Sequence, residues 1–456
     1  MGTPCKAIDS TWPTSVLLLL LLSAAAFAQP DTAWLFRYPG AGNGCHEPLT
    51  SFVDDTGNVY VVGWSHKGED RLDALLLKID SLGHPAWAAT YDHFTAAGAT
   101  RDSSGSIYIA GVSNGAGVAG RISMLRYRPD GGMSWAKTYG EPGKSFFALG
   151  TIAIDDSQNV YACGAAESSS CFAVRVVKYK PSGLLASVMR YTLSGYKYLW
   201  DGEFHILENE EAYLALSAEN PIPDAHWVVV KLSADSRVLW SRVYRNRDST
   251  WSVLYWSQVD KDANIYLTGE DRSFFCTMKM DSSGRVNWKA EYMGPDSLQG
   301  TSRFLYLANG NVYVSGWSMY NKNGQAPAIV VVKYGSLGNK LWASQWGGAD
   351  TSSVPGYTDE NLNPTYGLNS CSMNVDDSGN VYVTGTGAAR SGRDLILFAV
   401  LLKFDPQGRL VWAKKRPGSA WNGAIVVFDK RGALYDVGFG GTTGIGGIYV
   451  MKYRTR

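Results

Sequence analysis

The chain has 456 residues, with 42 basic and 41 acidic side chains and a formal net charge of +1. No polybasic run interrupts this balance, so we expect no binding to nucleic acid or to an anionic membrane surface. Fifty glycines and 57 aromatic residues (16 Trp, 26 Tyr and 15 Phe) indicate many tight turns and many large buried side chains, which is typical of all-β proteins.

Residues 1–28 have the features of a secretory signal peptide. Lys6 gives a weakly basic start, residues 16–27 form an apolar core, and Ala26-Phe27-Ala28 fits a small-x-small cleavage site. The apolar core is short for a membrane span, which needs about 20 residues. We therefore expect a secreted, periplasmic or cell-surface protein with no transmembrane segment after cleavage. An uncleaved anchor is the alternative.

From residue 31 onward the chain repeats a unit of about 50 residues, a period found in solenoids and propellers. Each unit is predicted to hold four short β segments. The first runs into an acidic corner, as in residues 149–155. The second is a V-Y-V phrase that occurs eight times, at residues 59–62, 107–110, 160–163, 212–216, 265–268, 312–315, 381–384 and 434–437.

The third segment is apolar and usually ends on Lys or Arg followed by an apolar or aromatic residue. A turn and a fourth segment follow, and in six of the seven internal units the fourth segment opens with tryptophan: Trp87, Trp135, Trp240, Trp288, Trp342 and Trp412. Ser187 takes this place in the third unit. We expect each tryptophan to pack between neighbouring units and to contribute roughly 2 to 3 kcal/mol by its burial.

The two ends of the mature chain complement each other. The chain stops after the third segment of the eighth unit, and residues 31–38 have the W-x-x-x-Y form of a fourth segment. A ring whose last blade is completed by the first strand leaves no unpaired edge along the repeat axis. The sequence therefore predicts one domain over residues 31–456, a closed β-propeller of eight four-stranded blades. Seven blades is the alternative.

The repeated phrases carry a family resemblance. DDSGNVYVTG followed by KFDPQG, within residues 376–408, resembles the bacterial β-propeller repeat family abbreviated SBBP. The resemblance extends over nearly all of residues 31–456. It implies a secreted or surface protein with an unassigned binding role and no family-wide catalytic residues, and the family's name implies seven blades where the count here gives eight.

The acidic corner is predicted to be a β-turn and not a calcium loop. Asp54 opens the phrase D-D-T-G-N, which runs directly into a strand, and Gly57 is replaced by Gln158, Glu210 and Ala263 in other units. A repeated ligand site would not tolerate those changes, whereas a turn needs only a capping Asp and a residue that accepts positive φ.

Cysteines and histidines give no pattern for a metal site or a cofactor, and we expect neither. Cys163 and Cys171 flank a predicted hairpin loop and are candidates for a disulfide; buried thiols are the alternative. His93, His205 and His226 are isolated along the chain, so we interpret each as structural.

Candidate binding residues lie on the loops that join the second to the third segment and the fourth to the next first. The longest connection, an insertion over residues 347–367, contains Tyr357, Asp359, Glu360 and Tyr366. Trp64, His66, Trp317 and Tyr320 are expected on the same face. Aromatic and polar side chains of this kind suit stacking on sugar rings or gripping a peptide.

A second aromatic set precedes the acidic corners by about eight residues and is predicted to ring the mouth of the channel. It comprises Phe94, Phe147, Trp200, Trp251 and Trp421. The alternative is that these residues are hydrophobic plugs beneath the loops.

These features predict a secreted, monomeric, non-enzymatic scaffold that binds a protein or a glycan. The alternative is a propeller enzyme that acts on polysaccharide or carries out a quinone-dependent oxidation. The chain lacks the adjacent cysteine pair of the familiar quinoprotein dehydrogenases, and catalysis would require several carboxylates, or a base with its partner, in one pocket. A purely architectural spacer is a third interpretation.

Overall fold

The computed structural model describes residues 31–39, 45–66, 72–113, 119–168, 171–219, 225–235, 237–245, 252–294, 300–318, 328–347, 365–391, 394–416, 425–442 and 445–454. The predicted signal peptide and residues 348–364 of the predicted insertion lie outside this part of the chain. None of the described segments is a helix long and apolar enough to cross a membrane.

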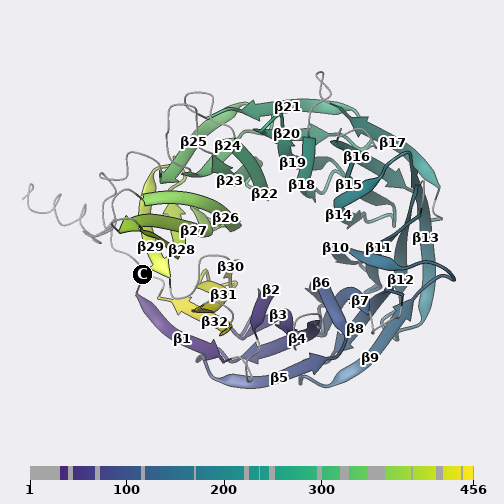
Figure 1. The fold of residues 1–456 in the computed structure, drawn as a ribbon, viewed down its shortest axis with the longest axis horizontal. Coiled ribbons are helices and arrows are strands. Elements are labelled where there is room, and N and C mark those ends of the chain that lie inside the picture. The colour runs from purple at the N-terminus through teal and green to yellow at the C-terminus, as the bar shows by residue number, and fades with distance from the viewer. Residues whose placement is uncertain are drawn as a thin grey trace, which may run out of the picture.

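Eight antiparallel sheets of four strands each form a ring around a central opening (Figure 1). Blade 1 holds β2 (His46–Val53), β3 (Val59–His66), β4 (Leu72–Ile79) and β5 (Pro85–Tyr91), and blade 2 holds β6 (Phe94–Arg101), β7 (Ile107–Ser113), β8 (Arg121–Tyr127) and β9 (Met133–Tyr139). Blade 3 holds β10 (Phe146–Ile154), β11 (Val160–Glu167), β12 (Cys171–Tyr179) and β13 (Leu185–Ser194), and blade 4 holds β14 (Tyr198–Ile206), β15 (Ala212–Glu219), β16 (Ala225–Leu232) and β17 (Val238–Tyr244).

Blades 5 to 8 continue the same order. Blade 5 holds β18 (Ser252–Val259), β19 (Ile265–Asp271), β20 (Phe274–Met280) and β21 (Val286–Tyr292), and blade 6 holds β22 (Gly300–Ala308), β23 (Asn311–Ser318), β24 (Ala328–Tyr334) and β25 (Lys340–Gly347). Blade 7 holds β26 (Thr365–Val375), β27 (Val381–Ser391), β28 (Asp394–Phe404) and β29 (Leu410–Arg416), and blade 8 holds β30 (Ile425–Phe428), β31 (Leu434–Thr442), β32 (Ile445–Tyr453) and β1 (Thr32–Tyr38). The predicted eight-bladed propeller is confirmed, and the seven-bladed alternative is wrong.

The ring closes where the two ends of the chain meet. β1 pairs antiparallel with β32, with Trp34 opposite Lys452, and the Arg454 amide donates to the Asp31 carbonyl at 2.8 Å. In Figure 1 the purple β1 lies beside the yellow strands of blade 8. The predicted completion of the last blade by the first strand is thus present.

The same pair of side chains recurs on the second and third strands of every blade. The tyrosine of the second strand lies opposite the Lys or Arg of the third strand, whose cation sits 4.9 to 5.7 Å from the tyrosine ring centre in all eight blades. The pairs are Tyr60–Lys78, Tyr108–Arg126, Tyr161–Lys178, Tyr213–Lys231, Tyr266–Lys279, Tyr313–Lys333, Tyr382–Lys403 and Tyr435–Lys452. The basic residue that ends each third segment therefore has a packing role, since a cation over an aromatic face is stabilising.

The fourth-strand tryptophans join neighbouring blades, as predicted. The indole N–H donates to a backbone carbonyl in the turn of the next blade at 3.0 to 3.2 Å, for Trp34, Trp87, Trp135, Trp240, Trp288 and Trp342. The ring covers a glycine of positive φ in that turn, such as Gly284 (φ 80°), where an added Cβ would lie 3.0 Å from the Trp240 ring. Only glycine fits both the backbone conformation and the ring contact.

The acidic corner is a turn that satisfies its own carboxylate. In blade 1 the Asp54 carboxylate accepts hydrogen bonds from the Thr56 and Asn58 amides at 3.0 and 2.9 Å and from the Tyr60 hydroxyl at 3.2 Å. Burial alone would raise the pKa of Asp54, but hydrogen bonds from the side chains and the amides of Thr56 and Asn58 outweigh it and lower the pKa to about 2. The corner is therefore a structural turn, as expected.

Candidate functional site

The ring has two faces with different connections. We call "corner face" the one that carries the acidic corners and the turns between third and fourth strands. We call "loop face" the one where second strands lead to third strands and each blade leads to the next. Because neighbouring strands in every blade are antiparallel, the two kinds of connection lie at opposite ends of the strands.

Several predicted binding residues lie outside the described part of the chain and stay predictions. They are Tyr320, Tyr357, Asp359, Glu360, Trp251 and Trp421. Tyr366 and Trp200 lie on β26 and β14, but their side chains are outside the described set.

Trp64 lies between blades and not on an open loop. Its indole N–H donates to the Ala96 carbonyl of blade 2 at 2.8 Å, and the ring packs against the core shared by blades 1 and 2. This residue therefore joins blades in the way the fourth-strand tryptophans do. From its position directly before a loop, the sequence predicts Trp64 as a binding residue and does not reveal the contact with Ala96.

Two residues of the predicted channel-mouth set serve the core. Phe94 is fully buried between blades 1 and 2 and meets Tyr91 edge to face, with ring centres 5.9 Å apart. Phe147 meets Phe172 in the same manner at 6.4 Å. For Phe94 the prediction of a channel-mouth position is wrong, because the first residue of β6 faces the neighbouring blade, and the alternative of a hydrophobic plug describes it better.

The candidate disulfide is not formed in this structure. Cys163 and Cys171 are both free thiols. In the β11–β12 hairpin Cys163 lies opposite Val176, whereas Cys171 is adjacent to the hairpin loop and its thiol lies 3.0 Å from the Ser168 hydroxyl. A disulfide would need Cys163 and Cys171 to lie opposite each other across the hairpin. The register instead puts Cys163 opposite Val176, five residues along β12 from Cys171.

The innermost strands carry β-bulges that the sequence pattern did not reveal. In seven of the eight blades the pairing of the first strand with the second shifts near its middle. The unpaired residues include Leu49, Ala97, Trp200, Tyr255 and Arg303. A bulge turns a side chain out of the regular alternation, and bulges are frequent near functional sites.

A hollow of about 720 Å³ lies among these innermost strands. Residues from β2, β6, β10, β14, β18 and β22 line it, so it belongs to the central channel of Figure 1. Its wall includes Trp256 and Tyr306 as aromatic residues, and Glu203, His205 and Gln258 as polar residues. Gln258 and Val259 directly precede the corner at Asp260, which places this hollow toward the corner face and not at the loop face where we expected ligands.

His205 is a neutral, partly buried member of this wall. Its Nε2 lies 2.7 Å from the Ser257 hydroxyl, and burial lowers the pKa of the imidazole to about 4. At neutral pH the ring is thus uncharged, so it can exchange hydrogen bonds but contributes no positive charge. The sequence predicts a structural role for His205, and its contact with Ser257 links blades 4 and 5 beside the hollow.

Arg303, at the bulge of β22, forms a second polar feature outside the set of residues that line the hollow. Its guanidinium lies 4.0 Å from the centre of the Tyr255 ring and 4.9 Å from that of Trp317. Its Nε is buried and has no hydrogen-bond partner among the described residues. Trp317, predicted as a binding residue, therefore supports a cation. The sequence pattern does not identify Arg303 as a candidate, because its contacts with two aromatic rings depend on the β-bulge between Ser302 and Phe304.

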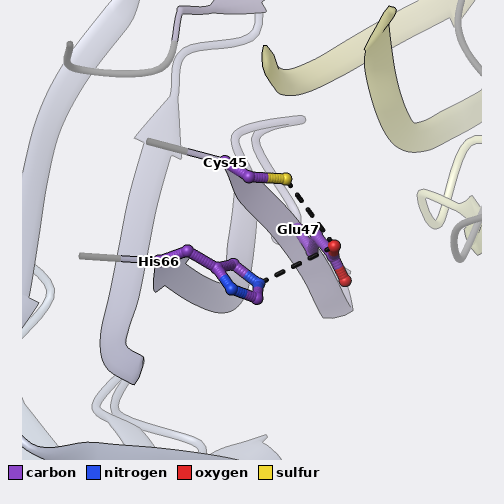
Figure 2. A group of neighbouring side chains, drawn as sticks. All are labelled: Cys45, Glu47 and His66. Carbon is purple, nitrogen blue, oxygen red and sulfur yellow. Dashed lines mark hydrogen bonds and ion pairs between the residues drawn. The ribbon is translucent and has the colours of Figure 1, made fainter. Parts of the chain in front are cut away.

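Strand pairing also brings together three side chains at the loop face of blade 1 (Figure 2). The Cys45 thiol lies 3.6 Å from Glu47 Oε1, and His66 Nε2 lies 3.7 Å from the same oxygen. Burial, with the negative charge of Glu47, raises the pKa of Cys45 to about 11. The sequence predicts no metal-ligand grouping, since such a prediction uses short spacings along the chain. Cys45 and His66 are far apart in sequence, and strand pairing brings them together.

The described wall of the hollow combines aromatic, amide, imidazole and carboxylate groups. Among the described side chains that line it, Glu203 is the one carboxylate. Glycoside hydrolysis usually requires a pair of carboxylates on either side of the scissile bond. Aromatic faces with amide, imidazole and carboxylate groups are sufficient to hold a polar ligand.

No family model and no curated protein matches the sequence. Among solved structures, a europium-containing methanol dehydrogenase is similar with a TM-score of 0.57 at 10% identity, and 93% of each chain is covered. An ulvan lyase described as a new family of polysaccharide lyase has a TM-score of 0.43 at 13% identity over 78% of this chain and 93% of that one. A Synechocystis apocarotenoid oxygenase has a TM-score of 0.40 at 10% identity, with 86% and 95% covered. At 10% identity the likeness to the methanol dehydrogenase is one of fold alone.

Proposed function

We propose that this protein is a secreted, non-enzymatic scaffold that binds a glycan in the hollow of its channel. The observation that carries the proposal is the wall of the hollow of about 720 Å³, to which six blades contribute residues and in which the aromatic rings and most hydrogen-bonding side chains come from blades 4 to 6. That volume lies within the range of pockets that hold small ligands. Sugars are bound by such combinations, since ring faces stack on their C–H groups and polar side chains pair with their hydroxyls.

A glycan fits this wall better than a folded protein does. A stable protein interface buries on the order of 800 Å² on each partner and needs a broad accessible surface. The concave wall of the channel offers its groups to a slender chain or to a chain end. A protein partner would instead bind outside the channel, where the loop insertion over residues 347–367 is the sequence-based candidate.

Arg303 favours a glycan with carboxylate or sulfate groups. Stacking between Tyr255 and Trp317 leaves the edge of the guanidinium for an acceptor, and its Nε has none among the described residues. Guanidinium groups pair with carboxylate and sulfate-like oxyanions through two parallel hydrogen bonds. Tyr255 directly precedes Trp256 of the wall, so a glycan chain that extends beyond the hollow along β18 would reach this cation.

Secretion fits the same proposal. The first 28 residues have a signal-peptide pattern, and an extracellular or envelope location gives access to polysaccharide. The resemblance of the repeats to the SBBP family supports a binding role outside the cytoplasm. Detection of the mature chain, beginning near residue 29, in the culture medium or in the envelope fraction would support this location.

The test is a screen of the mature protein on glycan and protein arrays. We expect binding to acidic glycans, with binding reduced at least about tenfold in Arg303→Met, since such charged hydrogen bonds contribute about 1.5 to 3 kcal/mol. Arg285→Met is the matched control, because Arg285 is an exposed arginine that pairs with Asp281 at the corner face. Glu203→Gln tests the wall of the hollow directly.

Three outcomes would contradict the proposal. Hits on the protein array that are lost on deletion of residues 350–364, without glycan hits, would move the site to the loop insertion. Cleavage of a bound glycan would show an enzyme. Glycan binding that is unchanged in both Arg303→Met and Glu203→Gln would place the site elsewhere.

A further inference from the structure

Cys45, Glu47 and His66 form the one group of at least three metal-ligating side chains, within the described ranges, whose ligand atoms all lie within 4.8 Å of one another. We propose that these residues bind a Zn²⁺ ion at the loop face of blade 1. Thiolate, carboxylate and imidazole are all zinc ligands, and sites with three protein ligands keep a fourth position for water or another oxygen. This site is separate from the glycan site, which lies in the channel.

The distances fit a tetrahedral ion. Zinc bonds of about 2.0 to 2.3 Å at tetrahedral angles put neighbouring ligand atoms roughly 3.3 to 3.6 Å apart. The thiol of Cys45 lies 3.6 Å from Glu47 Oε1, and His66 Nε2 lies 3.7 Å from it. These two separations lie within a few tenths of an ångström of coordination distances, and all three ligand atoms lie within 4.8 Å of one another.

A second observation also indicates a ligand. The Nε2 atom of His66 is shielded from solvent and has no hydrogen-bond partner among the described residues. Its separation of 3.7 Å from the Glu47 carboxylate is too long for a hydrogen bond. A shielded imidazole nitrogen without a partner costs free energy, and a metal ion bound to it would supply that partner.

The backbone holds the three side chains together. The His66 amide donates to the Cys45 carbonyl at 2.9 Å, which makes these two residues cross-strand neighbours. Cys45 and Glu47 are two residues apart, so an extended backbone points both side chains to the same side. Figure 2 shows the thiol and the imidazole converging on the carboxylate.

Charge and access are consistent with a divalent cation. On binding, the Cys45 thiol gives its proton to solvent and its sulfur forms the bond to zinc, so one thiolate and one carboxylate balance the charge of Zn²⁺. The side chains of His66 and Glu47 are 36% and 22% exposed, so an ion can enter from solvent.

The test uses the chelator-treated mature chain in equilibrium dialysis with zinc chloride. We expect about one Zn²⁺ per chain, and loss of a ligand should weaken binding at least about tenfold in Cys45→Ser and in His66→Gln. Cys171→Ser and His84→Gln are matched controls, since one removes a partly exposed free thiol on blade 3 and the other an exposed histidine. Cobalt(II) should give a thiolate charge-transfer band in the unmodified protein and in both controls.

A measurement on the unmodified protein avoids the risk that a variant fails to fold. Zn²⁺ should slow alkylation of Cys45, followed by peptide mass spectrometry, and should leave alkylation of Cys171 unchanged. Zinc binding that persists in both ligand variants, or alkylation of Cys45 that is indifferent to zinc, would overturn the proposal.

Discussion

His205 should make the stability of the ring depend on pH between about 6.5 and 4. The imidazole has a pKa of 6.5 when exposed, and burial lowers the pKa to about 4 in the folded protein. Between these values the unfolded chain takes up a proton that the folded chain does not bind. The stability that this group contributes is therefore complete above pH 6.5 and is lost as the pH falls toward 4.

The size of the effect follows from the two pKa values. Lowering the pH from about 7 to about 4.5 should reduce the free energy of unfolding by about 2 kcal/mol through His205 alone. Urea denaturation at both pH values measures this loss in the unmodified protein, in His205→Gln and in the control His84→Gln, whose side chain is 72% exposed. His205→Gln should lose most of the difference, while His84→Gln keeps it. Equal pH dependence in His205→Gln and the unmodified protein would refute the reasoning.

Three further predictions concern the repeated architecture. Ala263 has φ 57° at a corner position where Gly57 has φ 86°, so Ala263→Gly should raise the free energy of unfolding by about 1 kcal/mol, and a loss of stability in urea titration would contradict this. Gly284→Ala should cost about 2 kcal/mol, because the new Cβ meets the Trp240 ring. Gly432→Ala should cost less at a similar φ, because no atom lies within 4 Å of its Cβ; equal losses would show that the tryptophan contact is unimportant. Deletion of residues 31–38 removes β1 and leaves the edge of β32 unpaired, so light scattering should rise and the urea midpoint should fall; an unchanged midpoint would argue against closure at this seam.

The fold could be predicted because its signals are local and repeated. Each V-Y-V phrase marks a second strand, the corner phrase marks the turn before it, and the tryptophan marks the turn between the third and fourth strands. The last unit has only three β segments and residues 31–38 resemble a fourth, so the pairing of β1 with β32 could also be predicted. Replacement of glycine by Gln158, Glu210 and Ala263 at the corners also showed that the corner is a turn, and all three residues adopt positive φ of 57° to 62°.

The candidate sites could not be predicted to the same extent, because they depend on pairing across strands and blades. Arg303 is distinguished by a one-residue bulge that regular alternation along β22 does not reveal. Cys45 and His66 become neighbours only through the register of β2 with β3. Phe94 and Trp64 show the opposite case, since aromatic residues near loops were predicted to face a ligand and instead fill the space between blades.

The central claim is that the channel hollow binds an acidic glycan. Isothermal titration of the strongest glycan hit into the unmodified protein, Arg303→Met and the control Arg285→Met tests it most directly. The account predicts that affinity falls at least about tenfold in Arg303→Met and is unchanged in Arg285→Met. Equal affinities for all three proteins would contradict it.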